Sequence, residues 1–537
     1  MTFMPSRRTL IRGAALSTAY LATGPAIARL TGGPAWPSNP FALGVAAGAP
    51  SRDGFVLWTM LAPTPGSEDP SSPGGMTGPS VKLRYEIATD SGMQHVVQRG
   101  TAIAEAEYGY SVHKQITGLR PGRPYWYRFI SGTADSRVGR AMTLPGRNLD
   151  KLRFAFFSCS NYESGYFSAY RHAAAEAPDF GVFLGDYIYE YVDPGTKHAI
   201  VRHHSGGKEC VTLPEYRARY AQYRQDLDLQ ILHANVPSLL TWDDHEVQND
   251  YADKWGEEFQ DPKAFLERRA AAYRAFYEFM PLKPVFSAPH GPDMRVYDRY
   301  DFGDLLRVNL IDGRQYRSRE ACYGDPKKNE GHAGGGHLES AQSCPELFDP
   351  QRSMIGLPQE QWLFDGLATS KARWKVVAND VLMARLRQDN ADASITGGYW
   401  TDDWDGYPAS RTRLLDHIAK SKPSNPVVIT GDIHSFWAND LKADFDNPNS
   451  PTLASELVGT SVTSYGPPYD LFAKFVPNNP HVKFFDSRKR GYVSVELTRD
   501  KLFSRFQAVS DVRDPNAEIS TLVSFVIEDG KPGPVAA

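Results

Sequence analysis

The chain has 537 residues, of which 41% are hydrophobic and 12% aromatic, and its formal net charge is −4. This length exceeds what one compact core usually holds, so we expect two domains, one of them large. The composition excludes a disordered chain, and the charge gives no electrostatic basis for binding nucleic acid or an anionic membrane surface. The four cysteines are too few for a scaffold built on disulfides.

Residues 1–28 have the pattern of an export signal. Arg7 and Arg8 precede a mildly apolar segment at 13–24, and the small residues Ala26 and Ala28 flank Ile27 as a cleavage site would require. The alternative is a membrane anchor, but this segment is too short and too rich in Ala, Ser and Thr for a stable span. We therefore expect a cleaved twin-arginine signal, export by the twin-arginine machinery, a periplasmic or extracellular location and no stable membrane span.

Residues 40–145 have the composition of a small all-β domain. Apolar or alternating runs at 54–59, 81–87 and 125–129 are separated by turn residues, which predicts a β-sandwich. The segment 119–127 resembles the turn and strand of a fibronectin type III-like module. No His, Asp or Cys cluster occurs in this domain, so we assign it no chemistry.

After a linker at 144–147, short apolar strands alternate with helical stretches, which predicts an α/β catalytic domain with a layered αββα arrangement over residues 151–537. Helices are expected at 213–232 and 262–279, and antiparallel strands at 491–497 and 502–509. The other expected strands lie at 154–157, 182–184, 238–242, 305–311, 374–378 and 427–430.

The sequence Gly185-Asp186-Tyr187-Ile188-Tyr189-Glu190 follows the apolar run 180–184. An Asp at the end of a buried strand is costly unless a positive group meets it, and Tyr189 can reach the same point from the turn. A carboxylate beside a phenolate suits a hard, highly charged cation such as ferric iron. The alternative is a turn Asp with a packed Tyr.

Polar residues follow other apolar strands in the same way. Cys159 comes after one strand, where a packed small side chain is the alternative. Four consecutive ionisable residues, 243–246, come after another, and their charges need partners if they are buried. Asp432 and His434 follow a third and point to the same side of an extended segment. Asn379-Asp380 is a weaker signal that a helix cap would also explain.

The carboxyl ends of strands in open α/β sheets are where binding sites form. Seven potential ligands at such ends suit two or more metal ions that share a bridging carboxylate, as in displacement reactions at phosphorus. They are Cys159, Asp186, Tyr189, Asp244, His245, Asp432 and His434.

These motifs resemble those of the PhoD-like alkaline phosphatase and phosphodiesterase family, within the calcineurin-like metallophosphoesterases, nearly from end to end. The wider superfamily has an Asp and a His where this chain has Ser158-Cys159, and the Asp186/Tyr189 spacing also resembles purple acid phosphatases. The motifs that carry the resemblance are Phe157-Ser158-Cys159, Gly185 to Glu190, Trp242 to Glu246, Arg314 to Arg317 and Gly431 to Ser435, together with the signal and the small β domain.

The resemblance implies a hydrolase of phosphate esters whose site holds Fe(III) and Ca(II), one iron with two calcium ions. It places Cys159, Tyr189 and His434 at the iron and Asp186 as the bridge. It also places Asp244 and Asp432 on the calcium side, with Asn249 or Asn379 as a further ligand. His245 is then the candidate proton donor to the leaving oxygen, or a hydrogen-bond donor to phosphate.

Several residues keep two interpretations. Export favours a disulfide between Cys322 and Cys344, which leaves Cys210 as a free thiol or an alternative partner. Arg314 suits either a phosphate contact or a structural ion pair. His203-His204 indicates a solvated loop more than a metal site. The segment 399–407 is either a rim of the substrate pocket or a packed surface loop.

Three functions compete at this stage. The first is a secreted metal-dependent alkaline phosphatase that hydrolyses phosphomonoesters and phosphodiesters through a metal-activated water. The second is a dedicated phosphodiesterase or phospholipase D-like enzyme that acts on phospholipid or wall polymer. The third is a non-catalytic exported binding module, against which the complete ligand set argues.

Overall fold

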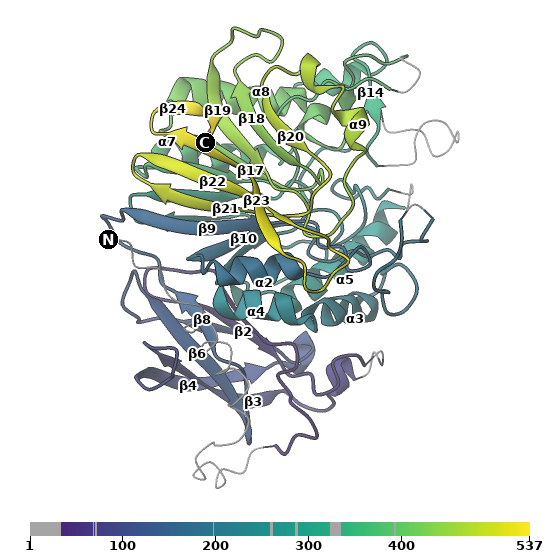
Figure 1. Ribbon diagram of the computed structural model, residues 1–537. Helices are drawn as coiled ribbons and strands as arrows, with labels where there is room; N and C mark the ends of the chain where they lie inside the picture. Colours follow the sequence, from purple (N-terminus) through teal and green to yellow (C-terminus); the bar gives the residue numbers. More distant parts are fainter. Residues whose placement is uncertain are drawn as a thin grey trace.

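The computed structural model describes residues 34–537, except residues 68, 70–71, 197, 258–260, 285–287, 323–334 and 391–393 (Figure 1). The predicted export signal at 1–28 lies outside the described residues. Within the described part of the chain, no helix combines the length and the apolar character needed to cross a membrane.

The largest sheet has ten strands and joins the first and last parts of the chain. Its parallel centre is β9, β10 and β11, and an antiparallel C-terminal meander flanks β9. The order is β24 (Lys531–Ala536), β23 (Ile519–Glu528), β22 (Lys501–Val509), β21 (Gly491–Thr498), β9 (Lys151–Phe157), β10 (Phe180–Leu184), β11 (Ser238–Thr241), β1 (Val45–Gly48), β2 (Phe55–Met60) and β5 (Ser111–Ile116).

Three further sheets occur in the part of the chain that the structure describes. The seven-stranded sheet runs β12 (Asp298–Phe302), β13 (Leu306–Leu310), β15 (Trp374–Ala378), β17 (Pro426–Thr430), β19 (Thr452–Val458), β18 (Phe436–Lys442) and β20 (Val482–Asp486). The five-stranded sheet comprises β4 (Val96–Ala104), β3 (Val81–Ala88), β6 (Pro124–Ser131), β7 (Ala134–Asp135) and β8 (Gly139–Met142). The smallest pairs β14 (Leu338–Glu339) with β16 (Tyr399–Trp400).

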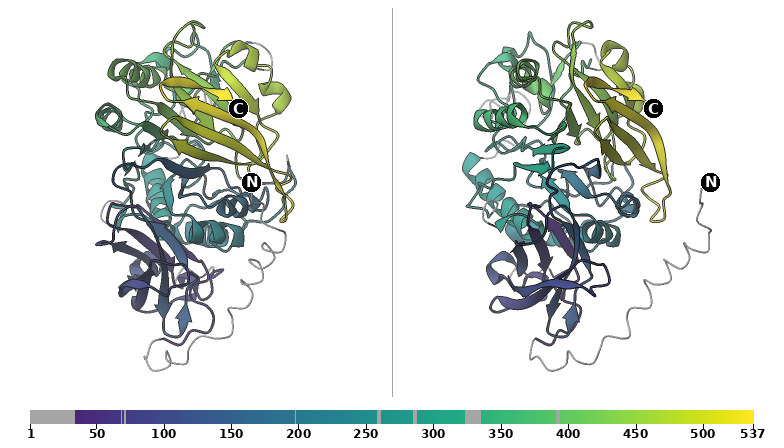
Figure 2. Two further views of the ribbon diagram at one scale, coloured as in Figure 1. Left: turned by 60° about the vertical axis from the view of Figure 1, so that its left-hand side comes forward. Right: turned by 90° about the vertical axis from the view of Figure 1, so that its left-hand side faces the viewer.

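The two large sheets pack face to face, with helices outside (Figures 1 and 2). One apolar core lies between the sheets and includes Phe154, Val182, Val308 and Ile429. The outer faces carry α2 (Ser168–Ala175), α3 (Leu213–Arg224), α4 (Leu227–Asn235) and α5 (Pro262–Phe279) on one sheet, and α7 (Leu357–Thr369) and α8 (Pro408–Ser421) on the other. The short helix α9 (Tyr469–Phe472) precedes β20. Because both faces of the central strands are covered, those strands are continuously apolar.

The N-terminal strands form a sandwich that is continuous with the ten-stranded sheet. Val45 and Leu57 face a core shared with the five-stranded sheet. The opposite faces of β1 and β2 pack toward the helices, where the indole nitrogen of Trp58 donates to the Glu278 carbonyl at 2.8 Å. The register pair Gly48 and Ser238 joins β1 to β11. The all-β composition predicted over 40–145 is therefore present, and one of its layers extends the ten-stranded sheet.

The helix predicted at 213–232 is wrong in its extent, because the structure has two helices there. Asp226 separates α3 from α4 and accepts hydrogen bonds from the backbone nitrogens of Asp228 and Leu229 at 3.0 and 3.1 Å. An Asp that caps the next helix ends the one before it.

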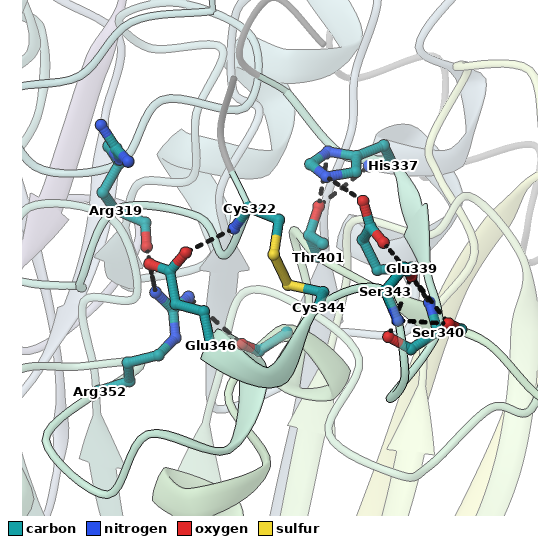
Figure 3. Close-up of a disulfide and its surroundings, with 11 residues drawn as sticks. Arg319, Cys322, His337, Glu339, Ser340, Ser343, Cys344, Glu346, Arg352 and Thr401 are labelled. Carbon is teal, nitrogen blue, oxygen red and sulfur yellow. Dashed lines mark hydrogen bonds and ion pairs between the residues drawn. A yellow bond between two sulfur atoms is a disulfide. The ribbon is translucent and has the colours of Figure 1, made fainter. Parts of the chain in front are cut away.

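The predicted Cys322–Cys344 disulfide is present, and Cys159 and Cys210 are free and buried. Figure 3 shows the bridge beside Glu346, which accepts from the Cys322 backbone nitrogen at 2.9 Å. On the other side, the Thr401 backbone nitrogen donates to the His337 carbonyl, and the His337 backbone nitrogen donates to Thr401 Oγ1. The disulfide therefore lies next to the loop that contains 401–407.

Candidate active site

The seven predicted site residues converge where strands of the two large sheets end. Their loops follow β9 (Cys159), β10 (Asp186 and Tyr189), β11 (Asp244 and His245) and β17 (Asp432 and His434). Four of these residues adopt left-handed backbone conformations, with φ of 60° at Cys159, 53° at Asp186, 61° at Asp432 and 52° at His434. Such conformations cost about 1–3 kcal/mol each and collect at functional sites.

Two glycines let these loops approach one another. A Cβ at Gly185, where φ is +104°, would lie 2.3 Å from the Cβ of Asp243. A Cβ at Gly431 would lie 2.6 Å from the side chain of Ser158. A side chain at either position would therefore push the strand ends apart.

The buried carboxylate of Glu246 holds these turns through hydrogen bonds to their backbone. Its carboxylate accepts hydrogen bonds from the backbone nitrogens of Asp186, Tyr187 and Asp243 at 3.2, 2.6 and 2.9 Å. Burial raises the pKa of Glu246 to about 7, while these backbone donors oppose the rise. Glu246 thus orients the loops after β10 and β11 together, a role that its position in the ionisable run did not reveal.

Cys159, Tyr189 and His434, the sulfur–phenol group, surround one oxygen of Asp186. The Tyr189 hydroxyl donates to Asp186 Oδ2 at 2.9 Å and lies 3.1 Å from His434 Nε2. Ser464 Oγ lies 2.7 Å from that hydroxyl, and Nδ1 of His434 lies 2.8 Å from the Tyr465 carbonyl oxygen. Three donor types, a thiol, a phenol and an imidazole, are therefore held around one carboxylate.

Asp243, Asp244 and Asp432, the carboxylate group, lie on the other side. Their ligand atoms lie within 4.8 Å of one another. The same limit holds for Cys159, Asp186 and His434, and for Asp186, Asp244 and His245. Asp186 and Asp244 each belong to two of these sets, so the candidate metal ligands form one connected chain.

Arg314 is buried beneath the carboxylate group. Its guanidinium donates to Asp243 and Asp402, at 2.7 Å for the latter, and lies 3.8 Å from Asp244 and 3.9 Å from Asp432. Its side chain is fully shielded from solvent. These contacts favour the structural ion pair over the phosphate contact.

His245 is oriented by Glu190, another buried carboxylate that the sequence left without a role. Nδ1 of His245 lies 2.8 Å from Glu190 Oε2, and Glu190 Oε1 accepts from the Asn249 backbone nitrogen at 2.8 Å. Burial alone would lower the pKa of His245, but Asp244, Glu190 and Asp186 raise it well above its ordinary value. The imidazole is therefore held as a proton carrier with Nδ1 engaged.

The site has more buried negative charge than the described protein groups neutralise. Burial raises the pKa of Asp186 well above its ordinary range, and it raises that of Asp432 to about 7 although Arg314 opposes it. The pKa values of Cys159 and Tyr189 are likewise raised, first by burial and then by Asp186. Asp243 Oδ2 is buried without a hydrogen-bond partner among the described residues. Cations at these sets would remove that imbalance, so the residues fit metal ions.

The two amides predicted as further calcium ligands, Asn249 and Asn379, have different surroundings. Asn249 lies beside the site and donates to Glu257 at 3.0 Å. Asn379 is buried, accepts from the Trp404 indole at 3.0 Å and donates to Thr430 Oγ1 at 3.4 Å.

The structure decides the interpretation of two loops, the one with His203-His204 and the segment 399–407. His203 is exposed, but His204 is buried, with Nδ1 3.3 Å from Glu163, so the solvated loop is wrong for His204. In 399–407 only Trp400 is exposed, while Thr401 to Tyr407 are buried. Asp402 pairs there with Arg314 and Arg317. The packed-loop interpretation therefore holds for 401–407.

The comparisons with known proteins agree over nearly the whole chain. The sequence model of the PhoD-like phosphatase matches residues 154–506, and that of its N-terminal domain matches 27–145. The chain belongs to the PhoD-like phosphatase family. It is 41% identical to alkaline phosphatase D of Bacillus subtilis (strain 168), over 98% of this chain and 88% of that protein. A solved PhoD structure superposes with a TM-score of 0.86 at 40% identity, covering 94% of this chain and 93% of that one.

Membership in the PhoD-like family makes this chain an alkaline phosphatase of the PhoD type. Its substrates are accordingly phosphate esters. The candidate metal sets lie in loops after β9, β10, β11 and β17, all within the part of the chain that the PhoD-like phosphatase model matches.

Proposed function

We propose that this protein is an exported, metal-dependent phosphatase that hydrolyses phosphomonoesters and phosphodiesters. The observation that carries the proposal is the sharing of Asp186 between the set with Cys159 and His434 and the set with Asp244 and His245. A shared carboxylate holds adjacent cations at the separation that displacement at phosphorus requires.

The chemistry of the ligand atoms suggests a different metal for each side of the site. The sulfur–phenol group, with Asp186 as bridge, would hold Fe(III), because a phenolate and a thiolate stabilise a highly charged ion. Asp244 and Asp432 would hold Ca(II), which prefers oxygen ligands, with two calcium ions to one iron. When bound, the metals would activate water and offset charge on the phosphoryl oxygens.

The protein residues supply orientation and a proton. The substrate phosphate would enter where the side chains of Asp432 and His434 are 27% and 24% exposed, the most open of the candidate ligands. His245, held through Nδ1 by Glu190, would donate a proton from Nε2 to the leaving oxygen. Glu246 and Arg314 keep the loops in place and do not contact substrate.

Export and domain division belong to the same proposal. Residues 1–28 would be removed as a twin-arginine signal, residues 40–145 would form the β domain, and residues 151–537 the catalytic domain. A disulfide at Cys322–Cys344 supports an oxidising location outside the cytoplasm.

Metal analysis with a visible spectrum tests the metal assignment. We expect about one iron and two calcium ions per chain, with a charge-transfer band from Tyr189 or Cys159 bound to iron. Zinc or manganese without a visible band would overturn that assignment. Rates on p-nitrophenyl phosphate and bis(p-nitrophenyl) phosphate test the scope. A monoester rate near zero would leave the dedicated phosphodiesterase.

A further inference from the structure

A hollow of about 300 Å³ adjoins the sulfur–phenol group, and four of its ten lining residues are Lys or Arg. Arg488, Lys489 and Arg490 come from the segment between β20 and β21, and Arg513 comes from the loop between β22 and β23. That loop runs beside α2 (Figure 1), where Arg171 donates to the Pro515 carbonyl at 3.0 Å. Two separate parts of the chain therefore place positive charge around one space.

The positive charge of the hollow is only partly neutralised. Arg513 pairs with Asp511 at 2.6 Å, and Arg488 pairs with Asp486 at 2.5 Å. Among the described residues, no ion pair to a carboxylate joins Lys489 or Arg490. Subtracting the two paired carboxylates from four cations leaves a surplus of two positive charges. A space of this kind attracts an anion.

Arg490 and Tyr465 connect the hollow to the candidate site. The guanidinium of Arg490 donates to the backbone carbonyls of His434 and Ser487 and to Thr460 Oγ1, the last at 2.9 Å. Tyr465 lines the hollow, and its carbonyl oxygen lies 2.8 Å from His434 Nδ1. The hollow thus shares a wall with the open side of the site.

We propose that this hollow is a subsite for a second anionic group of the substrate, a phosphate or a carboxylate carried away from the phosphate that is hydrolysed. The inference rests on the proposed function, since it names the class of ester that this site selects. Lys489 supplies exposed charge that is unpaired among the described residues, Arg488 and Arg513 add guanidinium donors that are paired with carboxylates, and Arg490 fixes the wall that the hollow shares with His434.

Matched substrates and a charge-removing variant test this subsite. Fructose 1,6-bisphosphate is compared with fructose 6-phosphate, and 3-phosphoglycerate with glycerol 3-phosphate. In the wild type, each substrate with the second anion should have the lower KM, and added NaCl should raise that KM more. The double substitution Lys489→Gln and Arg513→Gln should raise KM for the doubly anionic substrates about five- to tenfold, given the usual strength of exposed charge pairs. The kcat on fructose 6-phosphate should stay within about twofold.

The control is Lys82→Gln with Arg84→Gln on β3, which removes the same charge at exposed positions of the N-terminal sheet. Equal KM shifts in both double variants would assign the effect to net charge and overturn the subsite. Equal KM values within each substrate pair, in the wild type and at every salt concentration, would overturn it as well. A shift with the bisphosphate alone would restrict the second anion to phosphate. If the wild type hydrolysed none of these esters, the proposed function would fail instead.

Discussion

The two sides of the candidate site solve the problem of buried charge differently. The carboxylate group has a protein cation, Arg314, beneath it, which also binds Asp402 from a distant loop. The side chains of the sulfur–phenol group make neutral contacts, from Ser464 Oγ to Tyr189 and between His434 and the Tyr465 carbonyl. Within this group, Arg490 donates only to the His434 backbone carbonyl. One side can therefore persist without metal as an ion-pair network, whereas the other becomes charged only when a cation displaces its protons.

Asp186 belongs to two metal sets, one with Cys159 and His434 and one with Asp244 and His245, so its replacement should have the largest effect. The substitution Asp186→Asn keeps the shape of the side chain but removes a carboxylate ligand from two metal sets. Since loss of a residue that merely orients a ligand costs about 10–100-fold, losing a ligand of both sets should lower kcat/KM by about 10⁴-fold or more. Asp301→Asn, on an exposed part of β12, is the control. Retention of half the activity and of all metal would show that Asp186 is no shared ligand.

Arg314→Gln should chiefly reduce stability. It leaves Asp243 buried without its cation and Asp402 with Arg317 as its remaining partner, which costs about 3–5 kcal/mol in the free energy of unfolding. Thermal unfolding in metal-free buffer measures the effect. The control is Arg307→Gln, whose partner Asp301 is 50% exposed, so about 1 kcal/mol or less is expected. Unchanged stability with a raised KM for substrate would instead make Arg314 a phosphate ligand.

The strand ends of the site were predictable because each ligand motif directly follows a short apolar run. An apolar strand and a polar turn residue are adjacent in the sequence, and parallel strands bring those turns to one edge. The contacts that hold the ligands are not local. Arg314 and Asp402 are 88 residues apart, and Ser464 and Tyr189 are 275 apart. The hydrophobic periodicity of a sequence gives no information about contacts between residues so far apart.

The errors have the same physical origin. His204 stands among Gly and Ser residues typical of an exposed loop, yet it is buried against Glu163, 41 residues earlier. Asp402 and Asp405 gave 401–407 the polarity of a pocket rim, but arginines from elsewhere neutralise them in the interior. Polarity in a sequence indicates solvent only when no distant partner is available.

Substitution of His245 tests whether proton donation can be lost while both sides of the site keep their metals. His245→Asn retains an amide near Nδ1 for Glu190 but removes Nε2. The kcat on an alkyl phosphate should fall about a hundredfold with metal content unchanged. The loss should be smaller with p-nitrophenyl phosphate, because nitrophenolate leaves without a proton. His203→Asn, at an exposed position, is the control. An equal loss on both substrates, together with loss of metal, would make His245 a metal ligand.

Cys159→Ser should have the smallest effect on activity, and it should remove iron from one side of the site while calcium stays on the other. Serine keeps the shape of the loop after β9, but it binds ferric iron less well because it gives up its proton less readily than a thiol does. We expect iron content and the visible band to fall and activity to drop about 10–100-fold, while calcium remains at the carboxylate group. Cys210→Ser is a close control, since Cys210 is also free and buried and lies outside the metal sets. Simultaneous loss of iron and calcium in Cys159→Ser would show that the two sides assemble as one unit, and the contrast between them would fail.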